Sequence, residues 1–168
     1  MKIFLIGLMG CGKSFWAGRL GKKLRTGAYD LDSLVESIEE LSVAEIFEQK
    51  GEKYFRMAES AMLKHFGEKK AFVLATGGGT PCFHDNMQWM NNQGITIWLD
   101  EEIATLSERL RPEKEHRPLI KDLDDNALEG YLSAKRAERQ PFYAQAKIHL
   151  RSNEITSDKF SSIIKTHA

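Results

Sequence analysis

The stretch GLMGCGKS, residues 7–14, holds the first side chains that could do chemistry. Its glycines let the backbone curl so that successive N–H groups face a phosphate. Lys13 offers a charge to the β and γ phosphates, and Ser14 offers a hydroxyl to Mg²⁺. An apolar run, Ile3–Ile6, precedes the loop and a helical pattern follows it, which is the context of a P-loop. We therefore expect a nucleoside triphosphate here and disfavour a turn without a ligand.

A P-loop identifies the phosphate donor, so the acceptor must be sought elsewhere. The sequence YDLD places Asp30 and Asp32 two residues apart, after a short apolar segment. One carboxylate could hold Mg²⁺ through water, and the other could take a proton from an attacking hydroxyl. An aspartate at this place can also act only as a helix N-cap. The P-loop nearby favours the catalytic interpretation.

Arginine and glycine supply further candidates for binding an acceptor. Arg56 and Glu59, in GEKYFRMAES, share one helical face, and predict either a surface ion pair or an arginine aimed at a substrate carboxylate. Three consecutive glycines, Gly77, Gly78 and Gly79, follow an expected strand at Ala71–Ala75. Such a run is costly to order, and it indicates a ligand lying against backbone N–H groups at the carboxyl end of a strand.

Two further arginine positions lie in the second half of the chain. Arg117, in the polar stretch 111–125, could swing over the γ-phosphate as a lid residue or could simply be a solvated charge. Arg136 and Arg139 share one helical face, which indicates an anionic ligand, although a solvated face is the commoner outcome.

Composition excludes several classes of protein. The 168 residues suit one domain, residues 1–168, and Lys+Arg and Asp+Glu number 24 each, so nothing favours a nucleic-acid partner. The two cysteines, Cys11 and Cys82, are expected to be reduced, and the five histidines have no zinc-site spacing. The apolar run near the N-terminus is too short for a signal peptide or membrane span, so we expect no membrane association and a cytoplasmic location.

Elements that must position these residues alternate along the chain. Apolar runs predict strands, and amphipathic stretches between them predict helices, with Ser42 and Glu45 forming a capping box. The alternation predicts an α/β fold with a mainly parallel sheet. Expected strands are Ile3–Ile6, Ala71–Ala75, Ile95–Leu99, Lys147–Leu150 and one ending near Tyr29; expected helices are Lys13–Arg25, Ser42–Gln49, Glu52–Phe66, Glu101–Leu110, Asp124–Arg139 and Ser157–His167. The stretch 111–125 is expected to be a mobile surface loop.

Taken in order, the P-loop, Asp-x-Asp, Gly-Glu-x-x-Phe-Arg-x-x-Glu, the triple glycine, Arg-Pro-Leu and Arg-x-x-x-Tyr resemble shikimate kinase over about residues 2–150. The resemblance implies ATP-dependent phosphorylation of the 3-hydroxyl of shikimate, on the route to chorismate and the aromatic amino acids. It also implies a monomer with a three-layer P-loop kinase fold, in which helices flank a five-stranded parallel sheet. The substrate-binding region would be about residues 31–61, and the lid about 111–125.

Site roles carried over by this resemblance fall into four groups. Lys13, Asp32 and Arg117 would be catalytic, with Asp32 as the base. ATP would be bound by Gly10, Cys11, Gly12, Lys13, Ser14, Phe15, Arg109 and Arg117. Shikimate would be bound by Asp32, Arg56, Gly77, Gly78, Gly79 and Arg139. Mg²⁺ would be bound by Ser14 and Asp30.

This sequence departs from the family pattern at a few places. Phe15 stands where the family often has threonine, and the stretch RLRPEKEH is about one residue longer than in many relatives, which leaves Arg109 and Arg111 as alternatives beside the adenine. The spacing to Tyr143 favours Arg139 over Arg136. Alternative functions are another small-molecule P-loop kinase, such as a gluconate or nucleotide kinase, and a nucleotide-binding module without catalysis.

Overall fold

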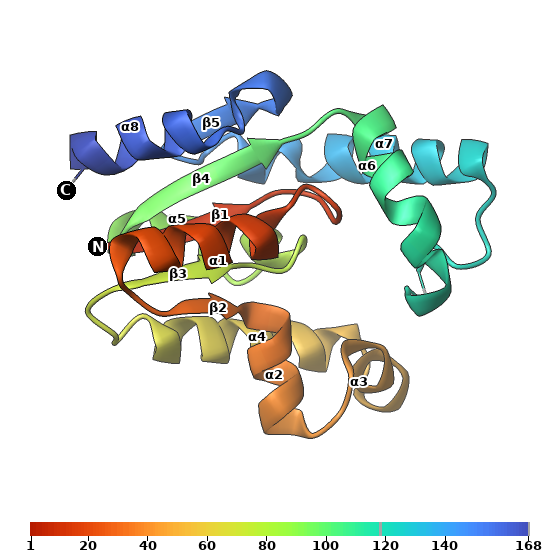
Figure 1. Ribbon diagram of the computed structural model, residues 1–168. Helices are drawn as coiled ribbons and strands as arrows, with labels where there is room; N and C mark the ends of the chain where they lie inside the picture. Colours follow the sequence, from red (N-terminus) through yellow and green to blue (C-terminus); the bar gives the residue numbers. More distant parts are fainter. Residues whose placement is uncertain (118, 168) are drawn as a thin grey trace.

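In the computed structural model, which describes residues 1–117 and 119–167, the strands form one five-stranded parallel sheet in the order β2-β3-β1-β4-β5 (Figure 1). The strands are β1 (Lys2–Ile6), β2 (Ala28–Asp30), β3 (Phe72–Ala75), β4 (Ile95–Asp100) and β5 (Ile148–Arg151). In the register, Leu5 lies opposite Ala75 on one side and Ile97 on the other. The carboxyl ends of the central strands therefore meet at one edge of the sheet.

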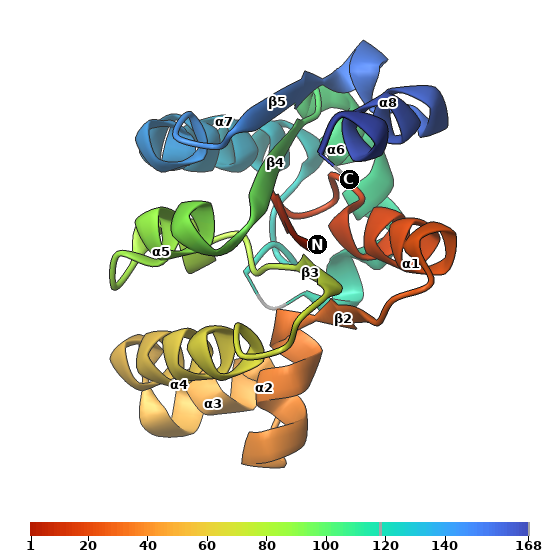
Figure 2. The same ribbon diagram turned by 90° about the vertical axis from the view of Figure 1, so that its left-hand side faces the viewer.

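Helices cover both faces of this sheet. They are α1 (Lys13–Leu24), α2 (Leu31–Glu39), α3 (Val43–Lys50), α4 (Glu52–Phe66), α5 (Asn86–Gln93), α6 (Ile103–Leu110), α7 (Asp125–Tyr143) and α8 (Ser157–His167), with short 3₁₀-helices η1 (Thr80–Cys82), η2 (Arg111–His116) and η3 (Ser152–Glu154). Figure 2 shows α1 and α8 on one side of the sheet and α4, α5 and α7 on the other. This is the predicted three-layer α/β architecture.

The apolar runs that predicted strands form the centre of the core. All of Phe72–Ala75 is buried, and Ile3–Ile6 is fully buried, because both faces of these strands are covered by helices. A second, smaller core of Val35, Ile46 and Phe55 holds α2, α3 and α4 together beside the β2 edge. The Ser42–Glu45 capping box is present at the start of α3. The predicted substrate region, residues 31–61, coincides with this group of helices.

Some elements differ from the sequence-based expectation. Helices α2 and α5 were not predicted, and the stretch 111–125 is not simply a loop, because η2 occupies its first six residues. Helix α7 continues to Tyr143, past the expected end at Arg139. Pro141 lies inside it, so the last turn forms without one backbone N–H. No helix in the described part of the chain is long and apolar enough to cross a membrane.

Candidate active site

The P-loop joins β1 to α1 at the carboxyl edge of the sheet. Gly7, Gly10 and Gly12 have φ values of 144°, 79° and 92°, a region that side chains rarely allow. A Cβ at Gly7 would lie 2.7 Å from the carbonyl oxygen of Leu99, so the loop also packs too closely for a larger residue. The Lys13 ammonium donates to the carbonyl oxygens of Gly7 and Leu8, both at 2.8 Å. The lysine thus lies within the concavity that the loop forms.

Ser14, in the first turn of α1, contacts Asp30 at the end of β2. The Ser14 hydroxyl donates to Asp30 Oδ2 at 2.5 Å, while Asp30 Oδ1 accepts from the backbone N–H groups of Asp32 (3.1 Å) and Ser33 (3.4 Å). Asp30 is therefore the N-cap of α2 and also accepts a hydrogen bond from the P-loop serine. No group of three or more His, Cys, Asp or Glu side chains placed to hold a metal occurs among the described residues.

Asp32 occupies an unusual electrostatic position. Burial, followed by repulsion from Glu59 and Asp30, raises the pKa of its carboxyl from 3.8 to about 6, although Lys13 lowers it. A Cβ placed on Gly77 would lie 2.9 Å from Asp32 Oδ1 and 2.7 Å from Glu59 Oε1, so Asp32 and Glu59 converge on the first glycine of the triple-glycine loop. At neutral pH Asp32 is mostly ionised yet more basic than an ordinary aspartate.

Arg56 is held on α4 beside the same loop. It is only 8% exposed, and its Nη1 donates to Glu59 Oε2 at 3.0 Å. Glu59 is fully buried and accepts from the Thr80 hydroxyl at 2.5 Å. The guanidinium carbon lies 4.5 Å from the ring centroid of Phe83, and a Cβ on Gly79 would lie 2.6 Å from it. Arg56 and Glu59 therefore form a buried ion pair that orients the arginine, and not a surface ion pair.

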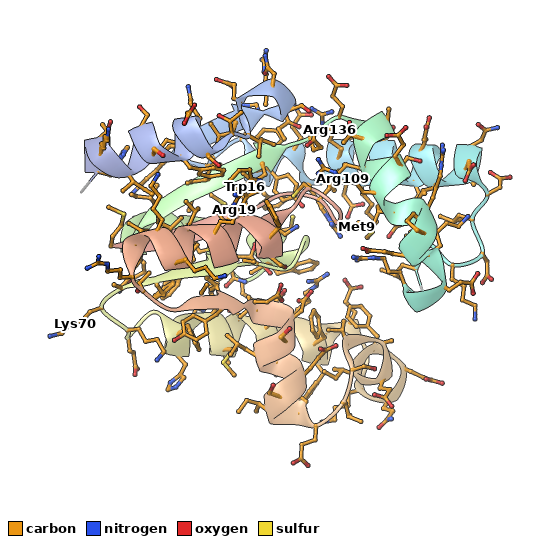
Figure 3. All side chains as sticks on the ribbon, viewed as in Figure 1. Met9, Trp16, Arg19, Lys70, Arg109 and Arg136 are labelled. Atoms are coloured by element: carbon orange, nitrogen blue, oxygen red, sulfur yellow. The ribbon has the colours of Figure 1, made fainter. Side chains whose placement is uncertain are left out.

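Arg139 and Arg136 lie on the same helix but have different neighbours. Arg139 Nη1 is 2.6 Å from the position of a Cβ on Gly78, and the Tyr143 hydroxyl, one turn along α7, donates to the Gly78 carbonyl at 2.5 Å. Arg136 instead pairs with Asp100 at 2.6 Å, at the end of β4 (Figure 3). Arg139 thus joins Arg56 and Asp32 around the triple glycine, and Arg136 does not.

Arg109 lies at the P-loop, where its Nη1 donates to the Gly10 carbonyl at 3.1 Å (Figure 3). Arg111 pairs with Asp125 at 3.4 Å, away from this loop. Of the two alternatives beside the nucleotide, the geometry therefore favours Arg109. Cys11 is buried, whereas Phe15 is 60% exposed at the start of α1.

Arg117, the predicted lid residue, is not brought to the phosphate loop. Its Nε and Nη2 donate to Glu113 Oε2 at 3.2 and 2.8 Å, one turn earlier in the same segment. Contact between Arg117 and the P-loop would therefore require that this exposed ion pair open.

Several residues of the site escaped sequence reasoning. Thr80 and Phe83 follow the triple glycine and contact Glu59 and Arg56. Trp16, Glu101 and Ile155 line a cavity with the P-loop and Arg109, together with Ser152 of the segment 151–153 that the family resemblance placed near the adenine. Glu101, Ser152 and Ile155 come from segments that follow β4 and β5, and no local motif marks them. The signal available was their place just after predicted strands, at the edge where ligands bind.

A P-loop at the end of a central strand, a parallel sheet of this order and a second group of oriented side chains at the same edge define a P-loop kinase. Deoxyadenosine kinase from M. mycoides shares this fold, with a TM-score of 0.61 over 99% of this chain and 98% of its own, at 18% identity. A family model described as shikimate kinase matches residues 9–168, and the chain belongs to this family.

Individual relatives agree with that membership. Shikimate kinase from Phocaeicola vulgatus is 39% identical over 154 residues, covering 92% of this chain and 88% of the relative. The crystal structure of shikimate kinase from Bacteroides thetaiotaomicron has a TM-score of 0.88 and 34% identity, covering 99% and 95% of the two chains. Shikimate kinase from Acinetobacter baumannii in complex with shikimate has a TM-score of 0.87 and 28% identity, covering 98% and 93%.

Proposed function

We propose that the protein transfers the γ-phosphoryl group of ATP to the 3-hydroxyl of shikimate. The observation that carries this proposal is the convergence of Asp32, Arg56 and Arg139 on the triple-glycine loop, at the sheet edge that also bears the P-loop. The pocket thereby offers two guanidinium groups and one basic carboxylate to the acceptor. A small carboxylate with several hydroxyls matches this set of groups. Family membership points to the same substrate.

Acceptor binding follows from the chemistry of those groups. Arg56 and Arg139 bind the carboxylate, because a guanidinium can donate two parallel hydrogen bonds to its oxygens. Glu59 and Phe83 orient Arg56, so little side-chain freedom is lost when the substrate binds. Backbone N–H groups of Gly77–Gly79 and the Asp32 carboxylate bind hydroxyls. The acceptor is then fixed at both ends, which is the main requirement of a phosphoryl transfer.

Donor binding belongs to the P-loop. Backbone N–H groups of Gly10, Gly12 and their neighbours cradle the phosphates, and the N-terminus of α1 adds its dipole. Among the residues that the structure describes, Lys13 has only backbone carbonyl partners besides the Cys11 sulfur, so phosphate oxygens can replace those partners. Ser14 Oγ and Asp30 Oδ2, 2.5 Å apart, are hard oxygen donors that fit Mg²⁺, which would neutralise phosphate charge when bound.

In the transfer itself, the 3-hydroxyl oxygen forms a bond to the γ-phosphorus, and the bond from that phosphorus to the β–γ bridging oxygen breaks. Asp32 accepts the hydroxyl proton, and ADP leaves. Lys13 and Arg117 offset the negative charge that spreads over the transferring group, once Arg117 exchanges Glu113 for phosphate. The segment 111–125 would act as the lid that excludes water.

Assembly and location belong to the same proposal. The large apolar side chains that the described residues expose, Phe15, Ile38, Met57, Phe83 and Leu119, are spread over different elements, which supports a monomer. Light scattering during size-exclusion chromatography would test it. We propose that the reaction takes place in the cytoplasm, where ATP is available.

The deciding experiment measures ADP release from ATP and Mg²⁺ with shikimate, and in parallel with gluconate, AMP or no acceptor. We expect strong stimulation by shikimate alone. Stimulation by another acceptor would overturn the assignment of Arg56 and Arg139 while leaving the P-loop kinase. ADP release without any acceptor dependence, from a protein that binds ATP, would favour a non-catalytic nucleotide-binding module.

A further inference from the structure

A cavity of about 510 Å³ lies beside the P-loop. Its walls include the ring of Trp16 and the side chain of Ile155, with Arg109 and Glu101 as the charged members. Gly10 and Gly12 border it, so a group attached to a phosphate chain in the P-loop would reach it directly. An aromatic and an aliphatic wall with a guanidinium suit a flat, polar heterocycle. The base of the bound nucleotide is such a group.

Glu101 is a buried, hydrogen-bonded carboxylate in the wall of this cavity. It is the first residue after β4 and is only 5% exposed. Glutamate side chains are seldom this buried unless they are paired. Its Oε2 accepts from Arg109 Nη2 at 3.0 Å, and its Oε1 accepts from the Ser152 hydroxyl and from the Glu102 backbone N–H at 3.2 Å. Both carboxylate oxygens are therefore used, and they tie together segments that lie some fifty residues apart.

The contact with Glu101 restricts the side chain of Arg109. Its side chain is 48% exposed, so without Glu101 it would have the freedom of a surface arginine. Its second anchor is the Gly10 carbonyl at 3.1 Å. Two anchors on different segments fix the plane and position of the guanidinium at the cavity wall, whereas a single exposed ion pair would not.

We infer that Glu101 is a positioning residue for nucleotide binding: with Ser152 it holds Arg109 in place against the nucleobase. The inference rests on the proposed function in that the P-loop must bind a nucleotide. It goes further, because the sequence assigned no role to Glu101. Since Ser152 opens the segment that carries Ile155, the same contact joins two walls of the base cavity. The substrate pocket around Gly77–Gly79 shares no residue with this network.

The test compares Glu101→Gln with Glu102→Gln in binding of ADP and of inorganic pyrophosphate by calorimetry. Glu102 is adjacent and exposed, and its side chain makes no capping hydrogen bond, so it is a matched control. In Glu101→Gln we expect the Kd of ADP to rise about tenfold, as for the loss of one charge-assisted hydrogen bond. Pyrophosphate, which has no base, should bind as to the wild type. Ser152→Ala should weaken ADP about threefold.

Kinetics and a double-mutant cycle separate positioning from a general effect on the fold. The KM for ATP should rise in Glu101→Gln while kcat and the KM for shikimate stay constant. In an Arg109→Met background, Glu101→Gln should add little further loss of ADP affinity, because the residue acts through Arg109.

Three results would each overturn the inference. They are an unchanged affinity for ADP in Glu101→Gln, an equal loss of affinity for ADP and pyrophosphate, and additive losses of ADP affinity in the double variant. The proposed function fails separately: a wild type that binds ADP but shows no acceptor-dependent turnover refutes the kinase assignment and leaves the base-site inference standing. Wild-type protein that binds pyrophosphate no more weakly than ADP would show that the cavity does not hold the base, and would overturn the inference too.

Discussion

Replacing Asp32 with asparagine should inactivate the enzyme and at the same time stabilise the fold. The side chain keeps its shape and loses its charge, so the proton acceptor disappears while the glycine loop keeps its neighbour. Asp32 has a folded pKa of about 6 against 3.8 in the reference state, mainly because burial and Glu59 disfavour the charged form. The ionised carboxylate therefore destabilises the folded state, and asparagine relieves it.

The magnitude follows from linkage. A difference of about two pKa units corresponds to ~3 kcal/mol at pH well above 6. Below pH 3.8 the carboxyl is protonated in both the folded and unfolded states, and this contribution vanishes. Because the folded pKa is raised, the gain from Asp32→Asn grows with pH: about 1.6 kcal/mol at pH 5 and ~3 kcal/mol at pH 8. Any effect of asparagine that does not depend on pH cancels in this difference.

Urea unfolding at pH 5, 6, 7 and 8, followed by tryptophan fluorescence, gives the free energy of unfolding of both proteins. Asp122→Asn, which removes an exposed carboxylate in the segment 111–125, is the control for the loss of one surface charge. In parallel, kcat of Asp32→Asn should fall strongly while ADP binding persists. A stability difference that stays constant or shrinks as pH rises would refute the burial argument. An unchanged kcat would refute the assignment of Asp32 as base.

Three other substitutions test the remaining parts of the site. Lys13→Ala should abolish ADP release without unfolding the protein, and near-normal turnover would remove the P-loop from the mechanism. Arg56→Ala should weaken shikimate binding, measured by calorimetry, by about 1.5–3 kcal/mol or more. Arg56→Lys is the variant that keeps a charge beside buried Glu59, and an unaltered affinity for shikimate would contradict the role of Arg56 in binding the carboxylate. Gly79→Ala should raise the KM for shikimate and spare ADP affinity, because its Cβ would lie 2.6 Å from the Arg56 guanidinium carbon, whereas Gly130→Ala in α7, with open space around it, should leave both unchanged.

Local patterns in the sequence predicted the elements whose cause is local. The buried strands are continuous apolar runs, and the start of α3 follows from the pairing of Ser42 with Glu45. Helix α2 was not predicted, but its pattern was readable, since Leu31, Val35 and Ile38 recur at helical spacing after Asp30, its N-cap. Helix α5 was not readable, because its eight residues are mostly polar or amide side chains with little periodicity. Tertiary packing of Met87 and Met90 holds it instead.

The same distinction between local and tertiary causes applies to the residues of the site. The P-loop, Asp30 and the triple glycine could be found because each is a short motif at a strand end. The environment of each side chain could not, because it depends on contacts between distant segments. Two arginines three residues apart on α7 have different surroundings, Gly78 for Arg139 and Asp100 for Arg136. The spacing to Tyr143 favoured Arg139, but the contacts that orient each arginine follow only from the fold.

The electrostatics of the acceptor pocket explain why Arg56 must be buried beside Glu59. Two carboxylates, Asp32 and Glu59, approach the same glycine, and their repulsion is one cause of the raised pKa of Asp32. Glu59 has no exposure to water, so Arg56 and Thr80 provide its compensation. Removing Arg56 would leave the buried Glu59 carboxylate without its cation, which is strongly destabilising. Arg56 therefore compensates buried Glu59 as well as binding the proposed substrate carboxylate, and a lysine, which has one point charge and no fork, could not meet both demands.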